Sequence, residues 1–212
     1  MTTVYLVRHG QSAANLTQTF AGHIDVSLTD LGQQQAVCTA EFLSHVPLTA
    51  VYTSDLGRAY DTGCAIAKLH GLAVMQNAEL REIFAGAWEG RTYAELEATD
   101  LAYHTWIHRI GQATCTDGES VKHLQKRVNN AVAEIVARHP DEVICIVSHG
   151  TPIRALTAML TQTPLEQMHT IPWASNASVT VLEFSSPQEG RIVSADLHEH
   201  LKGLVSKLPA NV

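Results

Sequence analysis

The chain has 212 residues, a length that suits one domain with a single core. Hydrophobic residues make up 45% of it and charged residues 17%, which excludes a disordered or fibrous chain. Fourteen Lys and Arg against 21 Asp and Glu give a formal net charge of −7, and no basic run occurs, so we expect no nucleic-acid partner. No apolar stretch approaches the ~20 residues that cross a bilayer, and the first residues lack the pattern of a secretory signal. We therefore expect no membrane partner and a cytoplasmic location.

Short apolar strands alternate with helices along most of the chain. The sequence predicts strands over residues 4–7, 50–53, 72–75 and 143–147, and a late hairpin or edge pair over 178–184 and 191–195. It predicts helices over about 28–43, 56–69 and 120–139, and a further helix after residue 150. Because strands that alternate with helices form mostly parallel sheets, we expect an α/β fold of three layers, with helices on both faces of the sheet. We expect one domain over residues 1–212, with a peripheral tail after Leu201.

Residues 79–119 are less regular and contain four glycines and two of the three tryptophans. We expect a cap-like insertion with one or two short helices, lying over the carboxyl edge of the strands. Its aromatic residues suit an organic group of mixed polar and apolar character, and its few basic residues argue against a bisphosphate. Two readings stay open for Trp88 and Trp173, which either line the mouth of a pocket or only pack.

Cysteines and most histidines have ordinary explanations. Cys38, Cys64 and Cys145 fall in apolar stretches, and we expect them to be small, reduced core residues. The spacing of His104 and His108 could suit zinc, but no third ligand is near in the sequence, so a surface or packing role is favoured. We expect the late pair, His198 and His200, to be solvated tail residues.

Two other histidines follow apolar strands in the same way. His9 follows the first strand and His149 the fourth, and a glycine comes directly after each. Each histidine alone would be an ordinary loop residue. Ligands of parallel sheets bind at the carboxyl ends of the strands, however, so both are aimed at the same edge. The helix that begins near Gly150 adds free N–H groups there, which suit an anion.

Arginines strengthen the prediction of an anion site at this edge. Arg8 and Arg58 lie at or just beyond strand ends, and a buried guanidinium without a partner is costly, so the pair indicates a bidentate anion. Asn15 could donate its amide to the same group. A phosphoryl group fits this set, with a sulfate or a carboxylate as the alternative.

The same residue types can perform phosphoryl transfer. A neutral imidazole can attack phosphorus, and arginines can neutralise the charge of the phosphoryl oxygens, so we expect no metal ion and no cofactor. A leaving alkoxide also needs an acid. Glu82 is the candidate, although a lone glutamate is usually only solvated.

The chain resembles the histidine phosphatase superfamily, also called the phosphoglycerate mutase-like family, along most of its length. Six blocks carry the resemblance, in the family's order and spacing: residues 6–12 (LVRHGQS) with Asn15, 22–32, 53–59, 80–90, 117–120 and 147–150 (VSHG). Gln11 replaces a frequent Glu, and His23 stands where an aromatic residue or Gln is common. These two departures bear on the substrate preference rather than on the chemistry.

The resemblance implies a role for each matched residue. His9 would be the phosphorylated nucleophile, and Glu82 would protonate the leaving group and then activate water. The phosphoryl group would be held by Arg8, Arg58 and His149. Asn15 and the backbone around Ala21 and Gly22 would contact phosphate or substrate.

This implies a metal-independent phosphomonoesterase that acts on a small phosphorylated metabolite. A phosphoglycerate mutase is the first alternative. It is disfavoured because only a short segment separates Gly90 from Gly118, and because Ile83, Phe84 and Ala85 stand where mutases place Arg and Tyr-type residues. The second alternative is a catalytically silent binding or regulatory module, which is disfavoured because the catalytic motif residues are retained. The sequence does not fix an oligomeric state, and a homodimer stays open.

Overall fold

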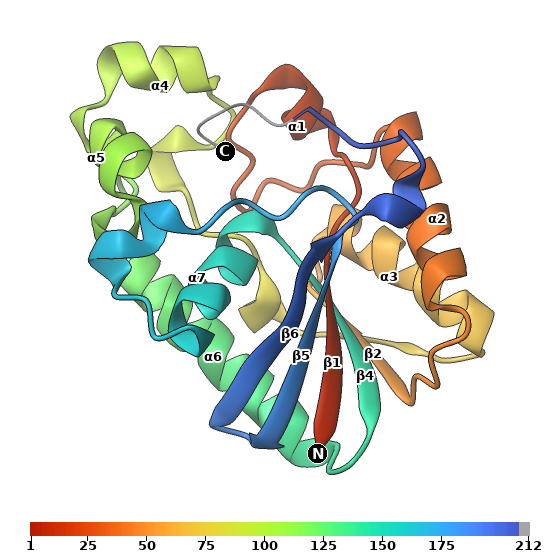
Figure 1. Ribbon diagram of the computed structural model, residues 1–212. Coiled ribbons are helices and arrows are strands. Elements are labelled where there is room, and N and C mark those ends of the chain that lie inside the picture. The colour runs from red at the N-terminus through yellow and green to blue at the C-terminus, as the bar shows by residue number, and fades with distance from the viewer. Residues whose placement is uncertain (208–212) are drawn as a thin grey trace.

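The computed structural model describes residues 1–207. In this part of the chain six strands form one sheet, in the order β3-β2-β4-β1-β5-β6 (Figure 1). Their bounds are β1 Thr2–Arg8, β2 Ala50–Thr53, β3 Val74–Gln76, β4 Val143–Ser148, β5 Val179–Ser186 and β6 Glu189–Leu197. The sheet combines helical crossovers in its first part with a hairpin at its end, which is the arrangement that the sequence predicts.

Four neighbouring strands of the sheet run parallel. β1 and β2 each pair in parallel with β4, and β2 also pairs in parallel with β3. β5 runs antiparallel to β1, and β6 antiparallel to β5. The register between β5 and β6 shifts at three points, so this outer pair is irregular. β3 starts at Val74, two residues later than predicted. The reason is that Gly71 ends the preceding helix at a φ of 65° and Leu72 N still donates to the carbonyl of Ala67.

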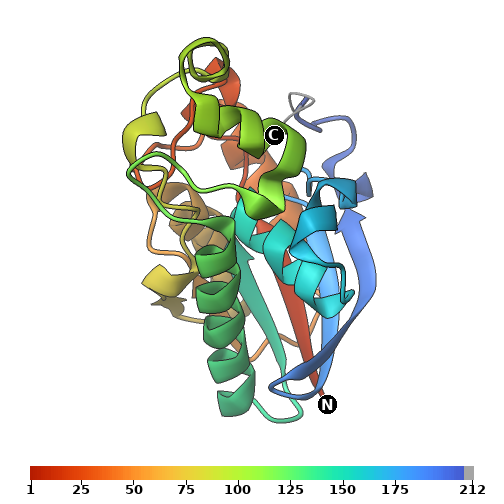
Figure 2. The same cartoon turned by 90° about the vertical axis from the view of Figure 1, so that its left-hand side faces the viewer.

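Seven α-helices accompany the sheet in the described residues. Their bounds are α1 Ala13–Thr17, α2 Asp30–Leu43, α3 Gly57–His70, α4 Tyr93–Thr99, α5 Leu101–Arg109, α6 Val121–Arg138 and α7 Gly150–Leu160. Figures 1 and 2 show α2 and α3 on one face of the sheet and α6 and α7 on the other. Thr29 caps α2 through Gly32 N and Ser120 caps α6 through His123 N, so side-chain caps fix where these helices begin. The three-layer α/β fold is therefore confirmed.

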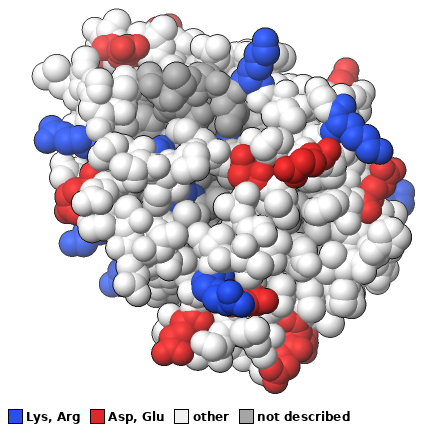
Figure 3. Space-filling model, viewed as in Figure 1, with Lys and Arg blue, Asp and Glu red and all other residues white. Residues whose placement is uncertain are grey.

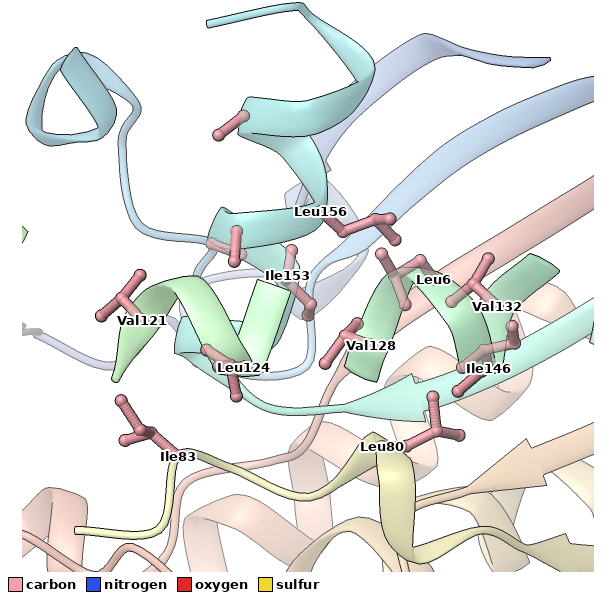
Figure 4. Close-up of a cluster of buried hydrophobic side chains, with 14 of the residues drawn as sticks. Leu6, Leu80, Ile83, Val121, Leu124, Val128, Val132, Ile146, Ile153 and Leu156 are labelled. Carbon is pink, nitrogen blue, oxygen red and sulfur yellow. The ribbon is translucent and has the colours of Figure 1, made fainter. Parts of the chain in front are cut away.

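The larger part of the core lies between the sheet and helices α6 and α7. Figure 4 shows Val121, Leu124, Val128 and Val132 of α6 beside Ile153 and Leu156 of α7, with Leu6 of β1 and Ile146 of β4. These α6 residues recur at helical spacing, which gives the helix a single apolar face. A second cluster packs α2 and α3 against the other face of the sheet.

The cysteines divide between the core and the flanks of helices. Cys145 is buried in the second cluster, as the sequence predicts. The prediction for Cys38 and Cys64 is wrong, because both are only partly buried. The inward face of α2 is formed by Ala36, Ala40 and Leu43, and Cys38 lies off that face.

The segment that precedes α6 contains α4, α5 and three short 3₁₀ turns at Ala78–Leu80, Gly86–Trp88 and Ile110–Gln112. Figure 1 shows α1 and α4 beyond the end of the sheet at which β1 and β4 terminate. Trp88 is fully buried here, and its Nε1 donates to Asp100. It packs edge-on against Phe20, Tyr103 and Trp106, so of the two readings for Trp88 the packing role is the correct one.

The end of the described chain is tied to the body of the protein. Leu201 is fully buried, and Gln35 Nε2 donates to Leu204 O and Ser206 Oγ. His200 stacks on Phe42 with a centroid distance of 4.6 Å and shares a hydrogen bond with Thr39. The prediction of a peripheral tail is therefore wrong for Leu204 and Ser206, and the prediction of a solvated side chain is wrong for His200. Residues 208–212 of that tail lie outside the described residues. Within residues 1–207 no helix has both the length and the apolar character that a membrane span needs.

Candidate active site

The ends of three strands bring the predicted site residues together. β1 ends at Arg8 and β4 at Ser148, which pair in register, so His9 and His149 follow side by side. Their ring centroids are 5.0 Å apart in an edge-on arrangement. Arg58 reaches the same place from the first turn of α3, which follows β2. These side chains are almost fully buried.

A cavity of about 50 Å³ lies at this edge of the sheet. Such a volume holds only a few water molecules, which is comparable with one phosphoryl group. Eight of the nine predicted site residues contribute to its wall: Arg8, His9, Asn15, Ala21, Gly22, Arg58, Glu82 and Gly150. The ninth, His149, is fully buried, and its ring packs edge-on against the ring of His9.

The ring of His9 has a fixed orientation. Its Nδ1 lies 2.6 Å from the carbonyl oxygen of Gly10, which can only accept, so Nδ1 carries the proton and Nε2 keeps a free lone pair. Thr62 Oγ1 accepts from Gly10 N at 3.1 Å and so holds the loop. Burial, followed by the positive charges of Arg58 and Arg8, lowers the pKa of His9 well below its usual range. His9 is therefore a neutral imidazole with an available nitrogen.

His149 is a buried polar group that lacks a protein partner. Neither ring nitrogen has a hydrogen-bond partner within the described residues. Burial, followed by Arg58 and His9, lowers its pKa well below the usual range. Because an unpaired buried polar group is costly, such a residue points to a ligand group that completes its bonding.

Arg8 and Arg58 place two cations at the cavity, and within residues 1–207 neither forms a salt bridge with a carboxylate. Arg8 Nη1 donates to Ala174 O at 2.6 Å, whereas its buried Nε has no partner in residues 1–207. Arg58 donates to Gly22 O at 2.8 Å and to Ile24 O at 3.0 Å. Burial lowers the pKa of both guanidinium groups, and the charge of Glu82 opposes that effect. Main-chain carbonyls thus orient two guanidinium groups whose charge suits an anion.

A side chain at position 150 would crowd the start of α7. A Cβ atom there would lie 3.3 Å from Arg8 Cζ and 3.4 Å from the ring of Trp173. The absence of a side chain lets Arg8 approach the positive end of the helix dipole, where an anion is favoured.

The carboxylate of Glu82 bridges two segments at the cavity. Its Oε1 accepts from Ile83 N at 2.7 Å and its Oε2 from Thr151 N, in the first turn of α7, at 3.2 Å. Its main-chain carbonyl accepts from His23 Nε2 and from Arg127 Nη2, both at 2.8 Å. Glu82 is therefore held on its side-chain and main-chain atoms alike.

Sequence reasoning missed three residues that support the site. Thr62 holds Gly10, Arg127 holds the backbone of Glu82, and Asn176 Nδ2 donates to His9 O and to Asn15 Oδ1, both at 3.2 Å. Asn176 is fully buried, although its sequence context resembles an ordinary loop. A buried asparagine is unusual and would have drawn attention, but a single sequence does not show that Asn176 is buried.

Neither a metal-binding cluster among the described residues nor a basic patch on the face drawn in Figure 3 competes with this site. Within residues 1–207 no three His, Cys, Asp or Glu side chains gather as a metal ion would require. Figure 3 shows Lys and Arg scattered singly among Asp and Glu on the face it draws.

Comparison with known proteins assigns the chain to a family. The model of the histidine phosphatase superfamily (branch 1) matches residues 4–196. The chain belongs to the histidine phosphatase superfamily. The resemblance carried by the six sequence blocks is therefore confirmed.

Several histidine phosphatases resemble this one over most of their length. Glucosyl-3-phosphoglycerate phosphatase of Mycobacterium tuberculosis is 34% identical over 192 residues, covering 84% of this chain and 83% of that protein. Phosphoserine phosphatase 1 of Hydrogenobacter thermophilus is 30% identical over 183 residues, or 86% of each chain. The solved structure of Bacillus stearothermophilus YhfR has a TM-score of 0.91 at 32% identity and covers 95% of this chain and 100% of that chain. This histidine phosphatase is thus similar to proteins named as phosphatases and to a solved structure of the same fold.

Proposed function

We propose that this histidine phosphatase hydrolyses small phosphomonoesters through a phosphohistidine formed on His9, without a metal ion. The observation that carries the proposal is the neutral His9 ring, with Nε2 free, beside two buried arginines at a cavity of phosphoryl size. The names of the similar phosphatases support the same class of reaction.

The first step transfers the phosphoryl group to the enzyme. His9 Nε2 attacks phosphorus, the bond from phosphorus to the ester oxygen breaks, and Glu82 gives its proton to that oxygen so that an alcohol leaves. Arg8, Arg58 and His149 hold the phosphoryl oxygens, with the N-terminus of α7 at Gly150 beside them. Asn15 and the backbone of Ala21 and Gly22 position the group from the facing loop.

The second step returns the enzyme to its starting state. Glu82 takes a proton from water, the water oxygen attacks phosphorus, and the bond to His9 Nε2 breaks to release inorganic phosphate. The bond from Thr151 N keeps the Glu82 carboxyl at the start of α7 in both steps. The same group therefore serves as acid and then as base.

The test is a trap for the intermediate. A labelled phosphomonoester mixed with the wild type and quenched in base is expected to leave acid-labile, base-stable phosphate on the protein. His9→Ala is expected to lose both this label and turnover, whereas His104→Ala, at an exposed position on α5, keeps both. Turnover that persists in His9→Ala would overturn the nucleophile.

The same preparation separates hydrolysis from mutase activity. We expect phosphate release from a phosphoglycerate to exceed interconversion of its 2- and 3-isomers. Interconversion faster than release would replace the proposed hydrolase by a mutase.

The proposal also covers the domain organisation of the chain and its cellular compartment. We place the whole chain in one domain, with residues 79–119 as an insertion that walls the substrate's organic part. All four cysteines are free, which suits a reducing compartment such as the cytoplasm.

A further inference from the structure

The cavity wall outside the phosphoryl-binding groups is aromatic and hydroxylic. Four aromatic side chains contribute to it: Phe20, Tyr93, Trp106 and Trp173. These rings pack against one another. The centroid of the Phe20 ring lies 5.1 Å from that of Trp106 and 6.1 Å from that of Tyr93, and the centroids of Trp106 and Trp173 are 6.5 Å apart. Such faces favour apolar carbon atoms of a leaving group.

The cations of this wall are already committed to the phosphoryl group. Among the described residues, Arg8 and Arg58 are the two basic side chains in it, apart from the neutral His9. Residues 208–212 have the sequence LPANV, which adds no basic side chain. No cation of the described wall is left for a second anionic group.

Arg154 stacks on Trp173 and is not among the described residues that form the cavity wall. Its Cζ lies 4.4 Å from the centroid of the Trp173 ring. Its Nε donates to Ile171 O at 2.7 Å and its Nη2 to His169 O at 3.0 Å. Trp173 and these two carbonyls therefore hold the Arg154 guanidinium in place.

The other ionisable groups of the wall add no positive charge. The Glu82 carboxyl faces the cavity, and burial raises the pKa of Tyr93 to about 12, so the phenol stays neutral. A carboxylate on the leaving group would lose water here and find aromatic carbon in place of a cation.

We propose, on the basis of the function proposed above, that the leaving group is an uncharged alcohol or phenol whose carbon atoms lie against the aromatic wall. Phosphomonoesters with a carboxylate on the leaving group are poor substrates. This preference sets the chain apart from its relatives named for phosphoserine and for glucosyl-3-phosphoglycerate, because both of those compounds carry a carboxyl group.

Two pairs of substrates test the preference. The first pair is glycerol 3-phosphate and 3-phosphoglycerate, and the second is phenyl phosphate and 4-carboxyphenyl phosphate. We expect kcat/KM to be roughly tenfold or more higher for the uncharged member of each pair, because an unpaired buried charge discriminates strongly. The second pair is stringent, since the carboxylate makes the phenol a better leaving group and chemistry alone would favour the charged member.

A variant with an added cation supplies the matched control. Thr19 lies half-buried in the cavity wall, so Thr19→Lys brings a charge to it while Thr19→Met brings similar length without charge. Relative to Thr19→Met, Thr19→Lys is expected to raise the ratio of kcat/KM for 3-phosphoglycerate to that for glycerol 3-phosphate by roughly tenfold.

Each outcome decides between the two proposals. Equal or faster turnover of the carboxylated members by the wild type would overturn the preference and leave the phosphatase assignment standing. No phosphate release from any of the four esters would overturn the phosphatase assignment, and the preference with it.

Discussion

Glu82 has a carboxyl group whose two oxygens are held by main-chain N–H groups of different segments. If Glu82 protonates the leaving oxygen, its removal should slow turnover most for esters whose leaving group is a poor one and needs a proton to depart. We expect Glu82→Gln to slow an alkyl phosphate by about 10²–10³ and 4-nitrophenyl phosphate by less than about tenfold. Steady-state kinetics with both esters measure the difference.

Glu89 provides the control for this experiment. Its carboxylate accepts from His23 N at 2.8 Å and from Ala85 N at 3.1 Å, so it organises the neighbouring loop. Glu89→Gln should change both esters alike. A leaving-group dependence that appears in Glu89→Gln and not in Glu82→Gln would move the acid to Glu89.

The two buried histidines predict a link between anion binding and protons. Burial and Arg58 keep the pKa values of His9 and His149 low, so both rings are neutral in the free site. A bound dianion offsets the positive charge around them and raises these pKa values toward the usual value of about 6.5. Binding therefore takes up protons between the lowered and the usual pKa, and affinity rises as the pH falls through that window.

Sulfate tests this link because it stays dianionic in the weakly acidic range. Calorimetry of sulfate binding at about pH 6, in buffers of different ionisation enthalpy, should report net proton uptake. His149→Gln should reduce that uptake. Proton release on binding, or affinity that weakens as the pH falls, would contradict the prediction.

At the scale of elements, α6 holds the segment that carries Glu82. Arg127 donates to the main-chain carbonyls of Glu79, Arg81 and Glu82, and forms an ion pair with Glu119 in which both side chains are almost buried. Burial alone would raise the pKa of Glu119, but the bonds from Arg127 hold it below its usual value. Arg127 therefore connects α6 with both ends of the insertion, residues 79–119.

Removing this arginine should damage stability and activity together. Arg127→Met removes the arginine from the buried Glu119, and we expect a loss of about 3 kcal/mol in the free energy of unfolding, with a lower kcat because the Glu82 backbone loses a bond. Urea unfolding measures the first effect. Arg138→Met on the same helix is the control, since its pair with Glu134 is exposed and should contribute almost nothing. Equal losses in the two variants would refute the special role of Arg127.

Local patterns made most elements predictable, and contacts distant in the sequence explain the failures. The apolar period of α6 and the caps Thr29 and Ser120 fix helices from neighbouring residues alone. The contact of the tail with Gln35 and the bond from Asn176 to His9 each join residues more than 160 positions apart. The catalytic candidates were visible because strand ends meet at one edge, whereas the residues that support them carry no local signature.

At the scale of the molecule, the groups that bind the phosphoryl group and the aromatic wall of the cavity come from different parts of the fold. Arg8 and His149 lie at the ends of paired strands, whereas Tyr93 and Trp106 belong to α4 and α5. Two arginines held by main-chain carbonyls neutralise the charge of the phosphoryl group in this arrangement.

We expect turnover to survive dialysis against EDTA, measured as phosphate release before and after treatment. Loss of activity that Mg²⁺ or Zn²⁺ restores would show that a metal ion shares the task.

The irregular outer hairpin also bears on how the protein behaves when concentrated. An edge strand with free N–H and C=O groups invites pairing with the edge of another molecule, which leads to aggregation. Here one edge is β3, only three residues long, and the other is β6, which carries Glu189, Arg191 and Asp196 and follows β5 through shifted registers. Shortness protects the first edge, while charge and uneven geometry protect the second. Intermolecular strand pairing is therefore disfavoured at both sides of the sheet.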